Sequence, residues 1–179
     1  MTIATATPSQ QRNASNAAGL AAVAIAAIAA STLAGAWFFQ LVFDIKPCPL
    51  CLEQRYAYYL ALPLAALVAL FVARGAPRQV VMAGFVILLI AALANAWLGG
   101  YHAGVEWQFW PGPTDCSGPL VDFGKAGNLL ERLDKVKVIR CDEVQWRFLG
   151  LSLAGYNVLI SLAMAAIALF GFVRSAKKV

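Results

Sequence analysis

The chain has 179 residues, of which 61% are hydrophobic and 13% are charged. Soluble domains contain about 45 to 50% apolar residues, so this composition excludes an ordinary soluble enzyme and indicates a membrane protein. The formal net charge of +5 is compatible with nucleic-acid binding, but the positions of the charges favour a membrane topology instead.

Four apolar runs are long enough to cross a bilayer, whose hydrocarbon core takes about 20 helical residues. They cover residues 17–39, 56–73, 80–101 and 148–173. The first run exceeds the roughly 7 to 15 residues of a signal-peptide core, so we expect it to remain as a span. The sequence therefore predicts an all-α membrane protein, a four-helix transmembrane bundle over residues 17–173. Residues 1–16 are predicted to be a disordered tail and residues 174–179 a basic tail.

The charges divide into two groups that predict which side each connection faces. One side has six cations and no acid, namely Arg12, Arg74, Arg78, Arg174, Lys177 and Lys178. All nine acidic residues lie in the other two connections, residues 40–55 and 102–147. By the positive-inside rule, we expect both termini to be cytoplasmic and the two acid-containing segments to face outward.

The first outer segment contains two cysteines three positions apart, Cys48 and Cys51. Pairs at this spacing close disulfides readily, and their thiol acidity is commonly raised, which predicts redox chemistry. Cys51 is expected in or just before the first turn of a helix, where partial positive charge favours its thiolate. Arg55 lies one helical turn later and is expected to present a cation on the same face.

The second outer segment, residues 102–147, is long and contains the other two cysteines, Cys116 and Cys141. Apolar residues at helical spacing predict a short amphipathic helix over residues 125–140, with Leu129 and Leu133 on its apolar face. This helix would lie on the membrane or pack against the segment itself.

All four cysteines lie outside the predicted spans, on the side where disulfides persist. A rigid pair beside the membrane and a second pair enclosing 24 residues indicate a relay of electrons between pairs. The alternative is a zinc site, but structural zinc sites generally use two tight C-x2–4-C pairs, and this chain has only one.

These residues resemble the bacterial disulfide-bond formation protein B (DsbB) family over residues 17–173. The resemblance is carried by a C-x-L-C-x-x-x-R pattern at Cys48, Leu50, Cys51 and Arg55, and by the segment after the last cysteine, Cys141 with Trp146, Phe148, Leu149, Gly150 and Leu151. Four spans and a cysteine pair in the second outer segment are also similar.

The resemblance implies a thiol:quinone oxidoreductase of the bacterial inner membrane, with its active cysteines facing the periplasm. Such an enzyme reoxidises a DsbA-like periplasmic thiol oxidase and passes the electrons through two cysteine pairs to ubiquinone or menaquinone. It thereby supports disulfide bond formation in exported proteins. A DsbA-like oxidant, with a potential near −120 mV, needs a stronger electron acceptor, and a membrane quinone is one.

The resemblance also implies a role for each site residue. Cys51 would contact the quinone, with Cys48 as its disulfide partner, Cys116 as the sulfur attacked by the soluble oxidase, Cys141 as the relay between pairs, and Arg55 and His102 as quinone contacts. Well-known members have Glu before the Arg, where this chain has Gln54 and carries Glu53 one position earlier. For His102, an interfacial hydrogen-bonding role is the alternative.

Two other functions compete with this one. The first is a non-enzymatic membrane scaffold or metal-binding protein, which purified protein carrying zinc rather than quinone would reveal. The second is a membrane thiol reductase of the vitamin K epoxide reductase type. Its CxxC is expected near the end of the last helix of the bundle, whereas here the CxxC precedes the second span.

Overall fold

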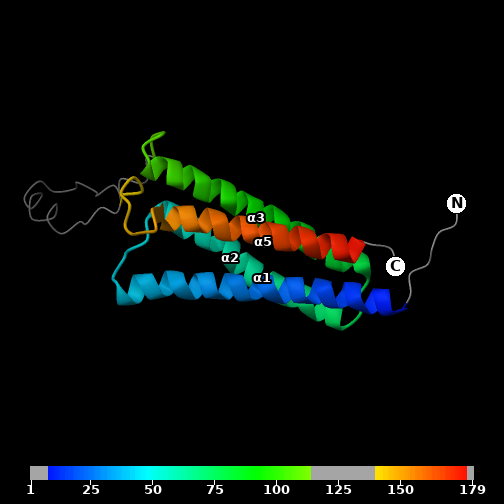
Figure 1. The fold of residues 1–179 in the computed structure, drawn as a ribbon. Helices are drawn as coiled ribbons and strands as arrows, with labels where there is room; N and C mark the ends of the chain where they lie inside the picture. The colour runs from blue at the N-terminus through cyan, green and yellow to red at the C-terminus, as the bar shows by residue number, and fades with distance from the viewer. Residues whose placement is uncertain (1–7, 114–139, 177–179) are drawn as a thin grey trace, which may run out of the picture.

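The computed structural model describes residues 8–113 and 140–176 and contains four long helices (Figure 1). They are α1 (Pro8–Val42), α2 (Pro49–Ala73), α3 (Arg78–Glu106) and α5 (Leu153–Ala176). Each is long and apolar enough to span a membrane, which confirms the predicted all-α fold with four spans. Cys116 and nearly all of the predicted amphipathic helix, residues 125–140, lie outside the described residues.

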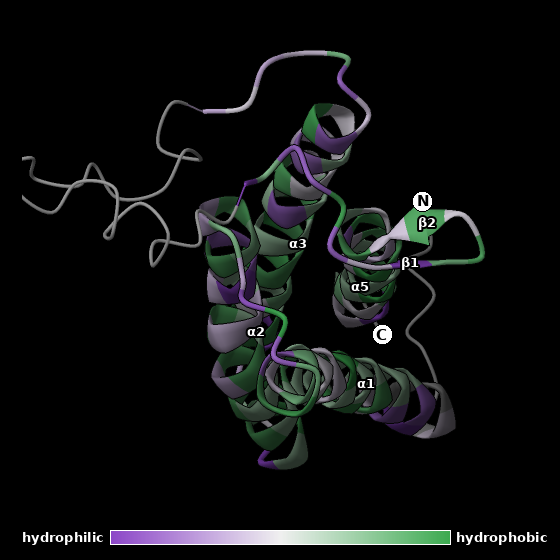
Figure 2. Cartoon of the chain, turned by 90° about the vertical axis from the view of Figure 1, so that its left-hand side faces the viewer, coloured by the Kyte–Doolittle hydropathy of each residue, from purple (hydrophilic) through white to green (hydrophobic). Residues whose placement is uncertain are grey.

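The helices run up and down, so Cys48 and Cys51, at the start of α2, lie at one end of the bundle. One end of the bundle holds the start of α1, the connection between α2 and α3, and the end of α5. The other end holds the start of α2 and the end of α3 (Figure 1). α1 packs against α2 and α5, and α3 packs against the same two helices. Figure 2 looks along the bundle from the cysteine end and shows the four helices arranged in a ring.

The helix boundaries differ from the predicted spans, because α1 and α3 continue beyond their apolar runs whereas α5 begins later than its run. α1 begins at Pro8, so part of the predicted N-terminal tail is helical. α3 continues to Glu106, which places His102 inside a helix rather than in the outer segment. α5 begins at Leu153, five residues later than the predicted start at Phe148.

A small β-hairpin occupies the residues before α5. Strand β1 (Arg147–Phe148) pairs antiparallel with β2 (Leu151–Ser152), with Arg147 opposite Ser152. The connecting Leu149 and Gly150 both have positive φ, 48° and 82°. Two-residue hairpin turns of the primed type require this conformation, which Gly adopts freely and Leu rarely does. The hairpin delays the start of α5 and brings Ser152 over the end of α3.

The bundle core is built from small and apolar side chains that allow close helix approach. Gly171 of α5 lies against Phe85 of α3, where an added Cβ would come within 2.3 Å of the aromatic ring. Phe85 is fully buried. Gly100, also on α3, has no neighbouring atom within 4 Å of the same hypothetical Cβ. Small residues are therefore required at the α3–α5 contact but not along the whole of α3.

Candidate active site

Cys48 and Cys51 lie at the beginning of α2, and the backbone there is fixed by the sequence. Cys48 is the N-cap residue, with φ −73° and ψ 166°, and Pro49 is the first helical residue. Proline suits this position because its φ is already helical and its missing N–H needs no partner. The backbone N–H of Cys51 donates to Cys48 Sγ at 3.3 Å. The two sulfur atoms are 2.8 Å apart, and both cysteines are free thiols.

The contacts that stabilise an anion converge on Cys48 rather than on Cys51. The hydrogen bond with the Cys51 thiol lowers the pKa of Cys48 to about 5, against the effect of burial and with a further contribution from His102. The sequence pattern predicts that the helix start favours a thiolate at Cys51, whereas the capping contact is made to Cys48 Sγ. The capping position belongs to Cys48, so the N-terminal N–H of the helix points at that sulfur.

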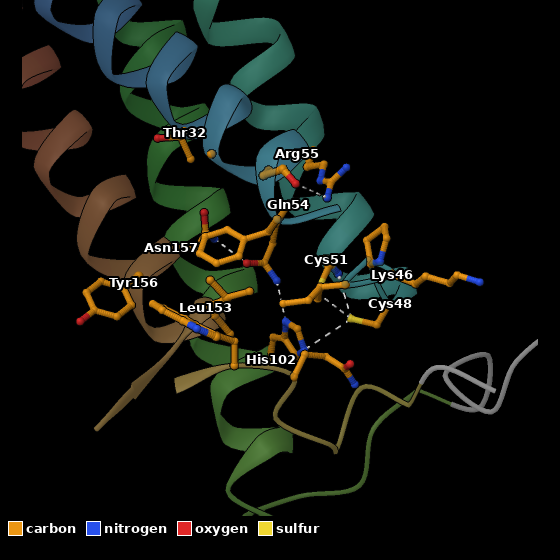
Figure 3. Close-up of a pocket in the computed structure, with 18 of the residues that line it drawn as sticks. Thr32, Lys46, Cys48, Cys51, Gln54, Arg55, His102, Leu153, Tyr156 and Asn157 are labelled. Atoms are coloured by element: carbon orange, nitrogen blue, oxygen red, sulfur yellow. Dashed lines mark hydrogen bonds between the residues drawn. The ribbon is translucent and has the colours of Figure 1, made fainter. Parts of the chain in front are cut away.

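His102 approaches the cysteine pair from α3 (Figure 3). Its ring is buried, and Nε2 lies 3.7 Å from Cys48 Sγ. One helical turn later, Glu106 places a carboxylate oxygen 3.9 Å from the same Nε2. The Glu106 carboxylate accepts a hydrogen bond from the hydroxyl of Ser152 at the end of the β-hairpin. A thiol, an imidazole and a carboxylate, the groups used most often in proton transfer, thus meet at this end of the bundle.

A chain of buried amides and hydroxyls leads from His102 into the bundle. Gln54 Nε2 donates to His102 Nδ1 at 2.8 Å, and Asn157 Nδ2 donates to Gln54 Oε1 at 2.6 Å. Asn157 Oδ1 accepts from Tyr58 at 2.5 Å and from Asn95 at 3.2 Å. Asn95 and Tyr58 also contact Ser161. This chain connects α2 to α5 across the ring, as polar side chains between membrane helices commonly do.

Arg55 lies on α2, but its hydrogen bonds go to α1. Nη1 donates to Gln40 Oε1 at 2.8 Å, and Nη2 donates to the Ala36 carbonyl at 3.4 Å. The guanidinium carbon also lies 5.7 Å from the centre of the Trp37 ring. Arg55 therefore joins the end of α1 to the beginning of α2 while still lining the same pocket as Cys51.

The segment before the hairpin brings Cys141 against the CxxC pair. Cys141 is disulfide-bonded and 1% exposed, and it belongs to a buried cluster with Cys48, Leu50 and Val105. The His102 ring makes a hydrogen bond with the backbone of Cys141. One oxidised cysteine and one reduced pair are therefore packed in a single cluster.

A pocket of about 180 Å³ opens beside this cluster, lined by all four long helices and by the segments before α2 and before the hairpin. Cys48, Cys51, Arg55 and His102 line it together with apolar residues such as Phe39. Four of the five predicted site residues that the structure describes thus share one cavity, whereas the fifth, Cys141, does not line it. Arg140, at its edge, forms a two-pronged ion pair with Asp142 that lowers the pKa of the exposed Asp142 carboxyl.

The same residues bear on the alternative of metal binding. Cys48, Cys51 and His102 offer three ligand atoms within 4.8 Å of one another. Two thiolates on one tetrahedral zinc, with Zn–S bonds of about 2.3 Å, lie roughly 3.8 Å apart. The sulfurs here are 2.8 Å apart, about 1 Å closer than two thiolates on one zinc.

Sequence reasoning did not identify two of the residues that contact His102. Gln54 is buried at 5% exposure, and the Glu106 side chain is 6% exposed. The available signal for Glu106 was its spacing of four residues from His102, which places both on one helix face. The available signal for Gln54 was that this polar residue lies one helical turn before Tyr58, on the inward face of α2. Glu53, in contrast, is exposed.

Comparison with known proteins identifies the family to which this chain belongs. Residues 18–171 match the family model of the disulfide bond formation protein DsbB. Relatives named disulfide bond formation protein B include one from Azoarcus sp. strain BH72, 32% identical over 150 residues, covering 79% of this chain and 84% of the relative. The relative from Marinobacter nauticus is 32% identical over 156 residues and covers 81% and 86%. One from Pseudomonas fluorescens strain Pf-5, named disulfide bond formation protein B 1, is 33% identical over 149 residues and covers 82% and 84%.

Proposed function

Since the chain belongs to the DsbB family of membrane proteins for disulfide bond formation, we propose that it is a thiol:quinone oxidoreductase. In this proposal it oxidises a DsbA-like periplasmic thiol oxidase and transfers two electrons to a membrane quinone. The observation that carries the proposal is the buried cluster in which the Cys48–Cys51 dithiol packs against a disulfide-bonded Cys141.

The arrangement supports thiol–disulfide exchange between two cysteine pairs. A thiolate attacks one sulfur of a disulfide, so the attacking and attacked sulfurs must come together. Cys48 and Cys141 occupy the same cluster, which favours exchange through these two residues. We assign Cys116, which lies outside the described residues, to the contact with the soluble oxidase. In each exchange one disulfide is reduced to two thiols while the other pair loses two electrons and two protons.

The pocket beside Cys51 suits a flat six-membered ring with two carbonyl oxygens. Its walls include apolar residues of α1 and α5, and Arg55 and His102 line it beside Cys51, with Arg55 as a hydrogen-bond donor. These three residues would hold the quinone. A quinone bound there would supply the acceptor for two electrons.

Cys48 and Cys51 then form their disulfide with the help of neighbouring residues. Cys48 is the sulfur with stabilised charge, with a pKa of about 5, and Cys51 is the more accessible sulfur, which lines the pocket. With a quinone as the acceptor, the Cys48–Cys51 pair would lose two electrons and two protons together, and the two S–H bonds would be replaced by one S–S bond. His102 stabilises the Cys48 thiolate, and Glu106 lies close enough to take part in proton release.

The test is an assay with purified protein, a reduced thioredoxin-fold oxidase and a soluble quinone analogue. We expect quinone absorbance to fall with formation of one partner disulfide per quinone reduced. Cys51→Ser should abolish quinone loss, whereas Arg74→Met, at the opposite end of the bundle, should leave it unchanged. Quinone that is not consumed by fully folded protein would refute the proposal. Bound zinc in place of quinone would support a metal-binding protein instead.

We also propose that the cysteine end of the bundle faces the periplasm and that both termini are cytoplasmic, on the basis of the charge distribution. After reduction, a membrane-impermeant thiol reagent should label the cysteines in cells whose outer membrane alone is permeabilised. Labelling that requires rupture of the inner membrane would overturn this orientation.

A further inference from the structure

The orientation of the Gln54 amide is fixed by contacts on three sides. Nε2 donates to the Leu50 carbonyl at 3.2 Å and faces His102 Nδ1 at 2.8 Å, while Oε1 accepts from Asn157 at 2.6 Å. Rotating the amide by half a turn would put Oε1 against the Leu50 carbonyl oxygen and would leave two donors facing each other at Asn157. The nitrogen of Gln54 therefore points at His102.

This orientation determines which nitrogen of His102 carries the proton. An amide N–H can only donate, so His102 Nδ1 must accept and has no hydrogen in the neutral ring. The proton is on Nε2, which faces Cys48 Sγ at 3.7 Å and Glu106 Oε1 at 3.9 Å, and the ring also makes a hydrogen bond with the backbone of Cys141. Cys48 and Glu106 accept hydrogen bonds most strongly when they are ionised, so the Nε2 proton is shared toward whichever of them carries the negative charge.

We infer that Gln54 is a positioning residue that holds His102 as a hydrogen-bond donor to the Cys48 thiolate. The arrangement has the form of a nucleophile, an imidazole and an orienting amide. Here the amide donates to the imidazole, so His102 stabilises the thiolate and does not remove its proton. The inference rests on the proposed function, because it gives that thiolate its role in closing the disulfide.

The relay of donors continues behind Gln54 and keeps the amide in place. Asn157 donates to Gln54, and Asn157 in turn accepts from Asn95 and Tyr58. Gln54, Asn157 and Asn95 are each at least 91% buried, so water does not compete for these bonds. The buried chain therefore does more than join α2 to α5. Each of its hydrogen bonds from Asn157 onward is donated toward His102, whose remaining N–H faces the Cys48 sulfur.

Other charged groups also face Cys48 and His102, and the test must separate their effects. They line the same pocket from α2, α3, the segment before α2 and the segment before the hairpin: Cys51 and Arg55, Glu106, Lys46, and Arg140 with Glu143. Of these, Glu106 lies within 4 Å of His102 Nε2. The measurements are accordingly repeated in a Glu106→Gln background.

The experiment measures the ionisation of Cys48 in the reduced full-length protein without quinone or partner. Short pulses of iodoacetamide between pH 4 and 9 are followed by mass spectrometry of the Cys48 peptide. Wild-type protein should show a midpoint near the pKa of about 5. Gln54→Met keeps the length of the side chain but removes the donor, so the midpoint should rise by about one unit. The rise should persist when Glu106 is Gln.

Two further variants test whether Gln54 acts through His102. In a His102→Ala background, Gln54→Met should cause no additional shift. Gln54→Glu keeps an acceptor for Asn157 but replaces the donor facing Nδ1 with a carboxylate. The imidazole then carries a proton on Nδ1, and the Cys48 profile should acquire a second step where the imidazolium loses its other proton.

Ser161→Ala is the matched control, because it removes hydrogen bonds at the far end of the same buried chain. It should leave the Cys48 midpoint unchanged. An unshifted midpoint in folded Gln54→Met, or an equal shift in Ser161→Ala, would overturn the inference. If Gln54→Met does not fold, a single-step profile in Gln54→Glu would overturn it as well. None of these readings requires quinone turnover, so failure of the proposed function would leave them interpretable.

Discussion

Replacement of Arg55 by Met should loosen the connection between α1 and α2. The guanidinium donates to Gln40 at 2.8 Å and to the Ala36 carbonyl at 3.4 Å, and it lies 5.7 Å from the Trp37 ring. A hydrogen bond to a charged group contributes about 1.5 to 3 kcal/mol in buried sites. Interhelical bonds in membranes average only about 0.6 kcal/mol, with a maximum near 1.7. Because Arg55 is partly exposed, we expect a loss of about 1 to 2 kcal/mol.

A double-mutant cycle isolates the bond between Arg55 and Gln40. Unfolding of the purified protein by sodium dodecyl sulfate, followed by circular dichroism, gives the free energy of unfolding for Arg55→Met, Gln40→Leu and the double variant. The coupling should be about 1 kcal/mol, with Arg55→Lys intermediate because it loses the fork of donors. Distant, independent sites add to within about 0.3 to 0.5 kcal/mol. A coupling within that margin would refute the role of this bond in holding the helices.

The same variants distinguish joining the helices from binding the quinone. If Arg55 stabilises negative charge on a quinone oxygen, Arg55→Met should raise the KM for quinone at least tenfold. Gln40→Leu leaves the cation in the pocket and should change the KM much less. Equal increases in both variants would mean that Arg55 affects quinone only by positioning α1.

Three other predictions follow from the packing and from the cysteines. Gly171→Ala forces a Cβ into an aromatic ring 2.3 Å away and should destabilise the bundle by about 1 to 3 kcal/mol, whereas Gly100→Ala should stabilise it by about 0.5 to 1 kcal/mol in the same denaturation assay. Cys141→Ser should accumulate a mixed disulfide between the soluble oxidase and Cys116, detectable on a non-reducing gel; a partner trapped on the CxxC instead would contradict the proposed order. The pKa of Cys48 is lowered from 9.0 to about 5, so the rate at which quinone reoxidises the reduced pair should stay constant from pH 8 to 6 and fall below about pH 5. Stopped-flow measurements of this rate test the prediction. A tenfold fall in the rate per pH unit from pH 8 downward would contradict the lowered pKa.

The sequence predicted the four spans correctly because each is a long apolar run, and burial in lipid leaves few other structures available. It also predicted the CxxC at the start of a helix. It did not predict which sulfur is stabilised, because the capping role depends on the ψ angle of Cys48 and on the two prolines that flank it. The sequence alone does not show which of Cys48 and Cys51 caps the helix, because this depends on Pro49 being the first helical residue.

The buried polar network escaped sequence analysis for a different reason. Gln54 and Glu106 are separated by 52 positions and meet only through His102, so no local pattern relates them. Asn157 stands in an apolar run, but its contact with Gln54 depends on α2 and α5 facing each other across the ring. The β-hairpin was missed because Leu149 has a positive φ, which a leucine seldom adopts.

The burial of Cys48 and Cys141 also has a consequence for unwanted reactions. Cys48 is 2% exposed and Cys141 is 1% exposed, so a charged tripeptide thiol such as glutathione cannot approach either sulfur in line for attack, whereas a small uncharged reagent can reach Cys48 through the pocket that it lines. Under the proposed function, burial would therefore protect these two sulfurs from dissolved reductants and leave Cys51, which is partly exposed, as the accessible sulfur of the cluster.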